Sequence, residues 1–299
     1  RNDMLDYALE VEYFDSHIGR MLRMLEERNM LENTLVIVTS DHGMPFPRVK
    51  GMPNMLANRV PMAMMWPGGI KQPGRVYDGI VSFTDFAPTF LELAGIPIEE
   101  SGMQTMEGQS LVSLLEGKSG SPGRDFMVFG KERTDVGRPD DVGFPARGIA
   151  NRDYVYIMNI HPERWPAGNP ETGYLDTDGS PTKTFILNDR RMKGESWFWQ
   201  QNFGKKPAEE LYDLREDPWL LDNLAENPDF QDVKEELKQQ LIEELKAEGD
   251  SRMFGKGDEF DKYPYADEAH RDFYNRMMKG EELDAGWVNP TDFERENIN

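Results

Sequence analysis

Leu35-Val-Ile-Val-Thr-Ser-Asp-His-Gly-Met-Pro-Phe-Pro-Arg-Val-Lys50 is the stretch of sequence that decides the fold. It opens with a short apolar run bounded by turn residues, which is typical of a buried strand in a parallel sheet. Ligands in open α/β sheets gather outside the carboxyl ends of strands, so Asp41 and His42 stand where a site is expected. Gly43 allows a sharp turn, and two prolines stiffen the loop that carries Lys50. The stretch predicts a site for a metal ion and an anion.

The same residues also have a purely structural interpretation. An aspartate at a strand end often caps the next helix, and a lone histidine is more often structural than a metal ligand. The Asp-His-Gly triplet alone does not choose between the two interpretations, so the choice depends on the sequence around it.

Five blocks of the sequence, taken in order, resemble successive blocks of the sulfatase family. They are Thr39-Ser-Asp-His-Gly43, Arg59-Val-Pro-Met-Ala-Met-Met-Trp-Pro-Gly68, Val81-Ser-Phe-Thr-Asp-Phe-Ala-Pro-Thr-Phe-Leu-Glu-Leu-Ala-Gly-Ile96, Gly108-Gln-Ser-Leu-Val-Ser-Leu-Leu115, and Glu210-Leu-Tyr-Asp-Leu-Arg-Glu-Asp-Pro218 with Asn223-Leu-Ala225. Within that family, Gly43-Met-Pro-Phe-Pro47 and Asn159-Ile-His-Pro162 most resemble the sulfamidase (N-sulfoglucosamine sulfohydrolase) branch.

The composition limits the classes of function that the chain can have. The chain has 299 residues, a formal net charge of −21 and no cysteine. The negative charge disfavours nucleic acids and anionic membranes as partners, and no apolar run is long enough to span a bilayer. Without cysteine there is no disulfide framework and no thiol nucleophile. The sequence starts at Arg1 and not at methionine, which suggests a processed or truncated N-terminus.

We expect an α/β fold: the C-terminal part of a doubly wound, sulfatase-like sheet with a small antiparallel α+β subdomain. Residues 1–118 are assigned to the catalytic domain, with a long amphipathic helix up to residue 29, strands at 35–38 and 60–66, and a helix closed by Gly95. Ser82 or Thr84 is expected to cap that second helix, and Asp85 to serve capping rather than metal binding.

The sequence pattern changes after a linker at residues 116–125, which is rich in small, polar and helix-breaking residues. Residues 119–250 are assigned to the subdomain, with short strands at 125–130, 146–150, 154–160 and 210–214 and a helix that starts at Asn227-Pro228. Residues 251–299 are rich in aromatic side chains, so we expect an ordered tail that wraps the body, with a short helix near 267–279.

The sulfatase resemblance implies hydrolysis of a sulfate ester or sulfamate by a formylglycine hydrate, with a divalent cation, most often Ca²⁺, that holds the nucleophile and the sulfate. Asp41 matches the family's metal-binding aspartate, and His42 fills the adjacent slot, which is often asparagine. Because Ca²⁺ prefers oxygen ligands, an imidazole there is a departure. Either His42 contacts the sulfate or the nucleophile rather than the ion, or the site takes a softer metal such as Zn²⁺. Mg²⁺ is a further possible cation. Lys50 aligns with the position that grips the sulfate oxygens.

No catalytic nucleophile is expected within this chain. Gly120-Ser-Pro-Gly-Arg124 has the proline and arginine of the family's nucleophile motif, but it has glycine at the reacting position and follows the metal block, so we reject it. The resemblance places the nucleophile and the remaining ligands in an N-terminal part of the same enzyme, so these residues alone are expected to be inactive. It also implies a periplasmic or secreted protein, and it leaves a homo-oligomer open.

The expected substrate is a sulfated saccharide similar to N-sulfoglucosamine, with His161 as a substrate-binding candidate in a His-Pro-Glu-Arg-Trp loop. Two alternatives stay open. One is a zinc-dependent phosphodiesterase or phosphatase of the wider alkaline-phosphatase superfamily, in which Ser-Asp-His-Gly also binds metal. The other is a non-catalytic relative that only binds saccharide.

Overall fold

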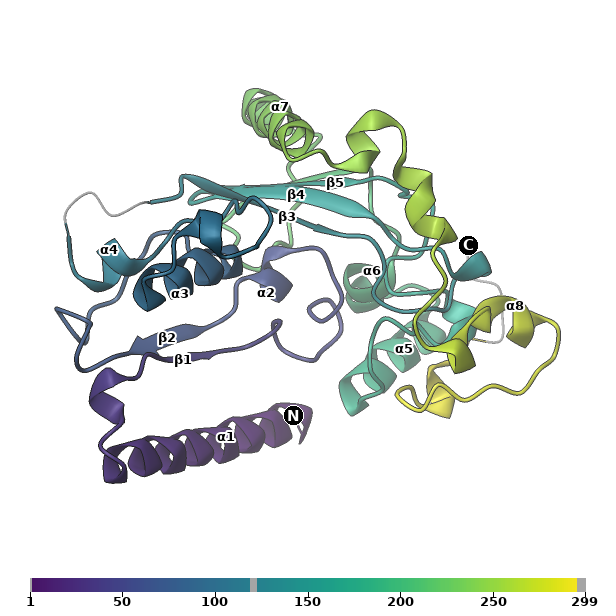
Figure 1. Ribbon diagram of the computed structural model, residues 1–299. Coiled ribbons are helices and arrows are strands. Elements are labelled where there is room, and N and C mark those ends of the chain that lie inside the picture. The colour runs from purple at the N-terminus through teal and green to yellow at the C-terminus, as the bar shows by residue number, and fades with distance from the viewer. Residues whose placement is uncertain (1, 119–122, 295–299) are drawn as a thin grey trace. The chain divides into compact units, whose positions relative to one another are not determined.

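The computed structural model describes residues 2–118 and 123–294, which fall into two compact units (Figure 1). The N-terminal unit comprises Asp3–Ser40 and Pro61–Met127, and the C-terminal unit comprises Asp41–Val60 and the chain from Val128 onward. The loop that starts at Asp41 therefore belongs with residues that follow it by a long way in the sequence. The three-part division at residues 118 and 250 stays a prediction.

The N-terminal unit starts with α1 (Asn2–Glu27), as predicted from its apolar periodicity. Several of its large apolar side chains are about half exposed or more, including Leu5, Leu9 and Phe14 at 53%, 61% and 51%. Strand β1 (Val36–Thr39) is followed by β2 (Met62–Met65), and α3 (Phe86–Ala94) and α4 (Val112–Leu115) complete the unit. No helix in the described residues is long and apolar enough to cross a membrane.

The prediction of a parallel strand at 35–38 is wrong. Strands β1 and β2 pair antiparallel, with Val36 opposite Met65 and Thr39 opposite Met62. A parallel pair needs a crossover that is usually a helix, whereas the helix in this connection, α2 (Met55–Asn58), has only four residues. Within the described residues the chain is a mixed α/β structure, and no doubly wound parallel sheet is present.

Asp85 has the capping role that the sequence predicted. Its side chain accepts the Ser82 N–H at 2.8 Å while the Ser82 hydroxyl accepts the Thr84 N–H at 3.3 Å, so the short 3₁₀ turn before α3 is closed reciprocally. The same carboxylate accepts the Gln109 N–H at 2.8 Å and pairs with Arg124. Residues 120–122 of the rejected nucleophile motif lie outside the described residues.

The C-terminal unit is built on a four-stranded sheet in the order β3 (Phe126–Lys131), β4 (Ala146–Asn151), β5 (Tyr154–Asn159), β6 (Glu209–Asp213). Strands β4, β5 and β6 are antiparallel neighbours, which confirms the predicted antiparallel arrangement. Helix α7 (Gln231–Ala247) covers one face of this sheet, and the segment with α2 lies on the other (Figure 1). Leu237, Leu241 and Leu245 are the buried stripe of α7.

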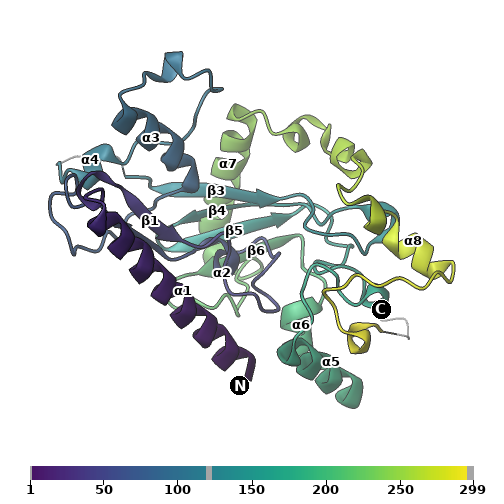
Figure 2. The same cartoon turned by 60° about the horizontal axis from the view of Figure 1, so that its bottom comes forward.

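Helices α5 (Pro181–Lys193) and α6 (Trp197–Phe203) lie beyond the end of the sheet in the same unit (Figure 2). Pro181 at the first helical position and the Ser180 side chain, which accepts the Lys183 N–H at 3.1 Å, start α5. A second core forms here around the edge-to-face pair Trp165 and Trp199, whose ring centroids are 6.0 Å apart.

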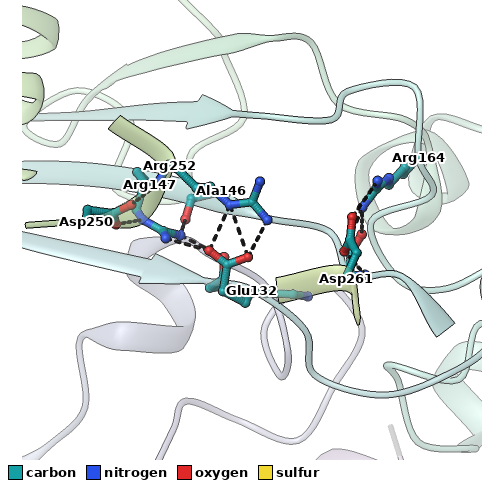
Figure 3. A network of polar contacts seen from close by, with 9 residues as sticks. Glu132, Ala146, Arg147, Arg164, Asp250, Arg252 and Asp261 are labelled. Atoms are coloured by element: carbon teal, nitrogen blue, oxygen red, sulfur yellow. Dashed lines mark hydrogen bonds and ion pairs between the residues drawn. The ribbon is translucent and has the colours of Figure 1, made fainter. Parts of the chain in front are cut away.

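The tail after α7 returns to the sheet through paired charges (Figure 3). Glu132 accepts from Arg147 at 2.5 Å and from Arg252 at 2.6 Å, and Arg147 also pairs with Asp250 at 2.5 Å. Helix α8 (Phe273–Met278) falls inside the predicted range, and its Phe273 is buried against Val136 and Leu175. The predicted short helix is confirmed, whereas the prediction that the tail wraps the body stays a prediction.

The stability of this tail contact is expected to depend on the ionisation of Asp135. Its carboxylate accepts the Val136 N–H and the Tyr265 hydroxyl, each at 2.9 Å. Burial raises the pKa of Asp135 to about 6, against about 3.9 in the unfolded chain. Between these values the folded form holds a proton that the unfolded form has lost. The contribution of this group to stability is therefore present below about pH 4 and lost as the pH rises through about 6.

Asp135→Asn, which cannot ionise, tests this expectation. Urea unfolding of both proteins at pH 4.5 and pH 7.5 should show the natural protein losing stability relative to the variant at the higher pH. Other titrating groups cancel in this difference because both proteins carry them. Equal differences at the two pH values would contradict the assignment.

Candidate active site

The loop after β1 is folded back on α2 by a close backbone approach. The Gly43 N–H donates to the Ala57 carbonyl at 2.8 Å, and a Cβ at position 43 would lie 2.2 Å from the Leu56 carbonyl oxygen. Only glycine fits there, which explains the residue after Asp41 and His42. The side chain of Asn54 caps α2 by accepting the Leu56 N–H at 2.9 Å. The position of Asp41 and His42 is thus set by contacts within residues 41–60.

His42 is oriented by its own backbone neighbourhood. Its Nδ1 lies 2.7 Å from the Gly43 carbonyl oxygen, which can only accept, so Nδ1 donates. In the neutral imidazole Nε2 is then the acceptor nitrogen. Nε2 lies 3.8 Å from Asp41 Oδ2, while Asp41 Oδ1 accepts the His42 N–H at 3.0 Å. The Asp41 side chain is 86% exposed. An acceptor nitrogen and an exposed carboxylate oxygen therefore lie side by side.

These two groups fit the start of a metal site but do not complete one. In metal sites, the histidine nitrogen that does not bind the metal commonly donates a hydrogen bond to a backbone carbonyl, which orients the other nitrogen toward the metal. Ligand lengths of about 2.3–2.6 Å, as for Ca²⁺, would let one ion reach two atoms at the observed separation. No cluster of three or more histidine or acidic residues arranged to hold a metal occurs in residues 2–118 and 123–294. Further ligands would have to come from elsewhere.

Lys50 is held in a different contact from the one its role requires. Its Nζ pairs with Asp178, and in the described part of the chain it forms no ion pair with Asp41. The side chains of Lys50 and Asp178 are 33% and 37% exposed, so both ends of the pair are accessible to solvent. The structure thus brings Asp41 and His42 together, whereas the Lys50 amine forms its ion pair with Asp178.

A buried charge cluster fixes the backbone next to Lys50. The Gly51 carbonyl accepts from Lys131 Nζ, which also lies 3.2 Å from Asp176, and Arg138 lies 2.8 Å from the same carboxylate oxygen. Asp176 and Arg138 are 0% and 1% exposed. Gly51 has φ +75°, and a Cβ there would lie 2.9 Å from the Asp176 carbonyl oxygen. Burial lowers the pKa of Lys131, opposed by the neighbouring Asp176 charge.

His161 is partly enclosed by its own loop. Its Nδ1 lies 3.0 Å from Glu163 Oε1, and its Nε2 is buried without a hydrogen-bond partner in the described chain. Arg164 from the same loop pairs with Asp261 at 2.9 Å (Figure 3), and Trp165 belongs to the α5–α6 core. The loop is therefore largely structural, and a saccharide contact by His161 stays a prediction.

Asp176, Asp178 and Lys131 were missed by the sequence analysis. They stand in Leu-Asp-Thr-Asp-Gly and Gly-Lys-Glu segments that carry no motif, and they meet the Lys50 loop only through folding. The density of acids directly after Tyr174 was the only available signal.

Comparison with known proteins identifies the sequence around this loop. Residues 1–96 match a protein-family model described as Sulfatase. The similarity to the sulfatase family is thus located in the first 96 residues. An ulvan-active sulfatase of Formosa agariphila is 30% identical over 257 residues, which cover 84% of this chain and 39% of that protein. A human N-sulphoglucosamine sulphohydrolase is 29% identical over 251 residues, which cover 81% of this chain and 47% of that protein.

The two identities are nearly equal, so the finer resemblance to the sulfamidase branch stays a proposal. The chain spans about 40–50% of the length of these curated relatives. A solved phosphonate monoester hydrolase of Agrobacterium radiobacter superposes with a TM-score of 0.54 at 20% identity, covering 78% of this chain and 39% of that one. This likeness concerns only the fold, and not the activity, of the chain.

Proposed function

We propose that this chain is the C-terminal part of a sulfatase that hydrolyses a sulfate ester or sulfamate on a sulfated saccharide. The observation that carries the proposal is the Asp41–His42 pair, in which Nε2 of an oriented imidazole lies 3.8 Å from an exposed carboxylate oxygen. The pair lies inside the residues matched by the Sulfatase model. The reaction adds water across an S–O or S–N bond and releases sulfate with the sugar hydroxyl or amine.

Each residue has a distinct task in this proposal. Asp41 and His42 would hold a divalent cation, which when bound offsets negative charge on the transferring sulfuryl group. Lys50 would place an ammonium against the sulfate oxygens, as a compact point charge. It would then exchange its pairing with Asp178 for one with the substrate, which the partial exposure of both side chains permits.

The substrate class is proposed from the relatives. Their names refer to ulvan and to N-sulphoglucosamine, and a further similar chain, at 21% identity, was solved with D-glucosamine-2-N,6-O-disulfate as its substrate. A sulfated sugar is the chemistry shared by these names. We propose an N-sulfated glucosamine residue as the first substrate to test, with the nucleophile supplied by the remainder of the protein.

Product release by the full-length protein tests the proposal. We expect sulfate release from N-sulfoglucosamine or a 6-O-sulfated sugar, and none from this chain alone. Removal of divalent cations with a chelator should abolish release, and adding back Ca²⁺ or Zn²⁺ separately should identify the metal.

Hydrolysis of a phosphate diester in place of the sulfated sugars, with bound zinc, would favour the phosphodiesterase alternative, because imidazole suits zinc. Saccharide binding without release of either product would favour a non-catalytic relative.

A further inference from the structure

A cavity lies between the Arg48–Asn54 segment and the ends of β5 and β6 in the C-terminal unit. Its wall is partly apolar, with Phe144, Ile157 and Leu220 among the lining residues. Its polar lining includes two cations, Arg48 and Lys206. The cavity is separate from the Asp41–His42 pair and from the Lys50–Asp178 pair, neither of which contributes to it.

The two cations have no carboxylate partner. Arg48 donates to the Leu220 carbonyl, and Lys206 donates to the Gln201 carbonyl at 3.2 Å. Arg48 and Lys206 are partly buried, and neither forms an ion pair within 4.0 Å in the part of the chain that the structure describes. The buried cations of this unit, among them Arg138, Arg147 and Lys183, are paired. The Leu220 and Gln201 carbonyls are neutral acceptors, so neither cation is paired directly with a carboxylate.

The one acid of the cavity wall, Glu210, keeps its negative charge but directs both carboxylate oxygens at neutral donors. Glu210 Oε1 accepts from Asn159 at 2.7 Å, and Glu210 Oε2 accepts from the Tyr212 hydroxyl at 2.6 Å. Asn159 is 3% exposed, and its side-chain oxygen has no hydrogen-bond partner in the described residues. This oxygen is an acceptor and would not bind an anion, so Arg48 and Lys206 are the groups of the wall that would.

Holding this arrangement carries a free-energy cost. Burial lowers the pKa of Arg48 and of Lys206, and the Arg48 charge lowers that of Lys206 further, against the opposing charge of Glu210. Arg48 also has φ +72°, a left-handed backbone conformation that non-glycine residues rarely adopt and that tends to occur at functional sites. A negative ligand between the two cations would offset the cost of burying them.

We propose that this cavity binds a small oxyanion, such as inorganic sulfate or phosphate, between the Arg48 guanidinium and the Lys206 ammonium. Charged hydrogen bonds to a tetrahedral oxyanion suit a guanidinium fork and an ammonium point charge. The site needs neither a bound metal nor turnover, so it stands or fails independently of the proposed catalytic function.

Calorimetric titration of the chain with sodium sulfate and with sodium phosphate, at an ionic strength held constant with sodium chloride, tests the site. We expect saturable one-to-one binding that Lys206→Gln weakens roughly 10- to 100-fold, the range for losing a charged hydrogen bond. Lys205→Gln is the matched control, because Lys205 is exposed and lies over the Trp165 ring at 4.9 Å. It should bind like the natural protein.

Thermal unfolding separates this role from a structural one. In chloride alone, Lys206→Gln should unfold at the same temperature as the natural protein or higher, because it removes a partly buried charge that has no ion-pair partner in the described residues. Lys206→Arg keeps the charge and should retain binding, which covers the case in which the glutamine variant does not fold. The absence of saturable binding, or an equal effect of sulfate on the natural protein and Lys206→Gln, would overturn the proposal.

Discussion

Replacing Lys50 with methionine in the full-length protein should lower kcat/KM for a sulfated sugar by roughly 10²- to 10³-fold, the usual effect of removing one positive or donor group from a developing negative charge. Methionine keeps most of the length of the side chain and removes the ammonium. The proposed role of Lys50 is electrostatic contact with the sulfate oxygens, so the loss should appear in turnover. Steady-state sulfate release measures it.

The folded structure should survive this change. The Lys50–Asp178 pair is about one-third exposed at each end, and such pairs contribute only about 0–1 kcal/mol. The circular dichroism spectrum and the unfolding temperature of the Lys50 variant should therefore match those of the natural protein. Lys205→Met is the exposed control: it should also match in both measurements, and it should keep full activity. Unchanged turnover by the Lys50 variant would remove this residue from the site.

Asp176→Asn is expected to lower the free energy of unfolding by roughly 3–5 kcal/mol, the cost of leaving buried charges without their partner. Asp176 is 0% exposed and lies 2.8 Å from Arg138 and 3.2 Å from Lys131, which are themselves buried. Asparagine preserves the shape of the side chain but leaves two cations uncompensated. Because Lys131 also donates to the Gly51 carbonyl, the variant should loosen the Lys50 loop as well.

Asp178→Asn provides the comparison for this effect. It removes an acid two positions away that pairs with a single, partly exposed lysine, so its cost should stay near 0–1 kcal/mol. Guanidinium unfolding of the three proteins measures both values. If the two variants lose equal stability, the buried cluster does not stabilise the fold as argued here.

Local patterns predicted part of the secondary structure of this chain, but not helices α5 and α6, which lie between two predicted strands. The strands at 146–151 and 154–159, the stripe of α7 and the capping of Asp85 all follow from residues within a few positions of one another. The pairing of β1 could not be predicted from its own residues, because a short apolar run fits a parallel or an antiparallel neighbour equally well.

The candidate site divides in the same way. The contacts that orient Asp41 and His42 are made between neighbouring residues of the sequence. The Asp-His-Gly triplet was therefore enough to predict that these two side chains lie together. The partner of Lys50 lies 128 residues further along the chain, where nothing in the sequence points back to it. The orientation of His42 depends on one carbonyl, whereas the contacts of Lys50 depend on the complete C-terminal unit.

This discontinuity has a consequence for synthesis. Residues 41–60 leave the ribosome long before the strands and the tail with which they pack, and Glu132 must wait a further 120 residues for Arg252. Contacts so distant in sequence form late because the intervening chain must first be closed into a loop. The loop with Lys50 would thus lack these partners until the later strands have been made, and a chain that ends after residue 127 would contain the Asp41–His42 pair but neither Lys131 nor Asp178.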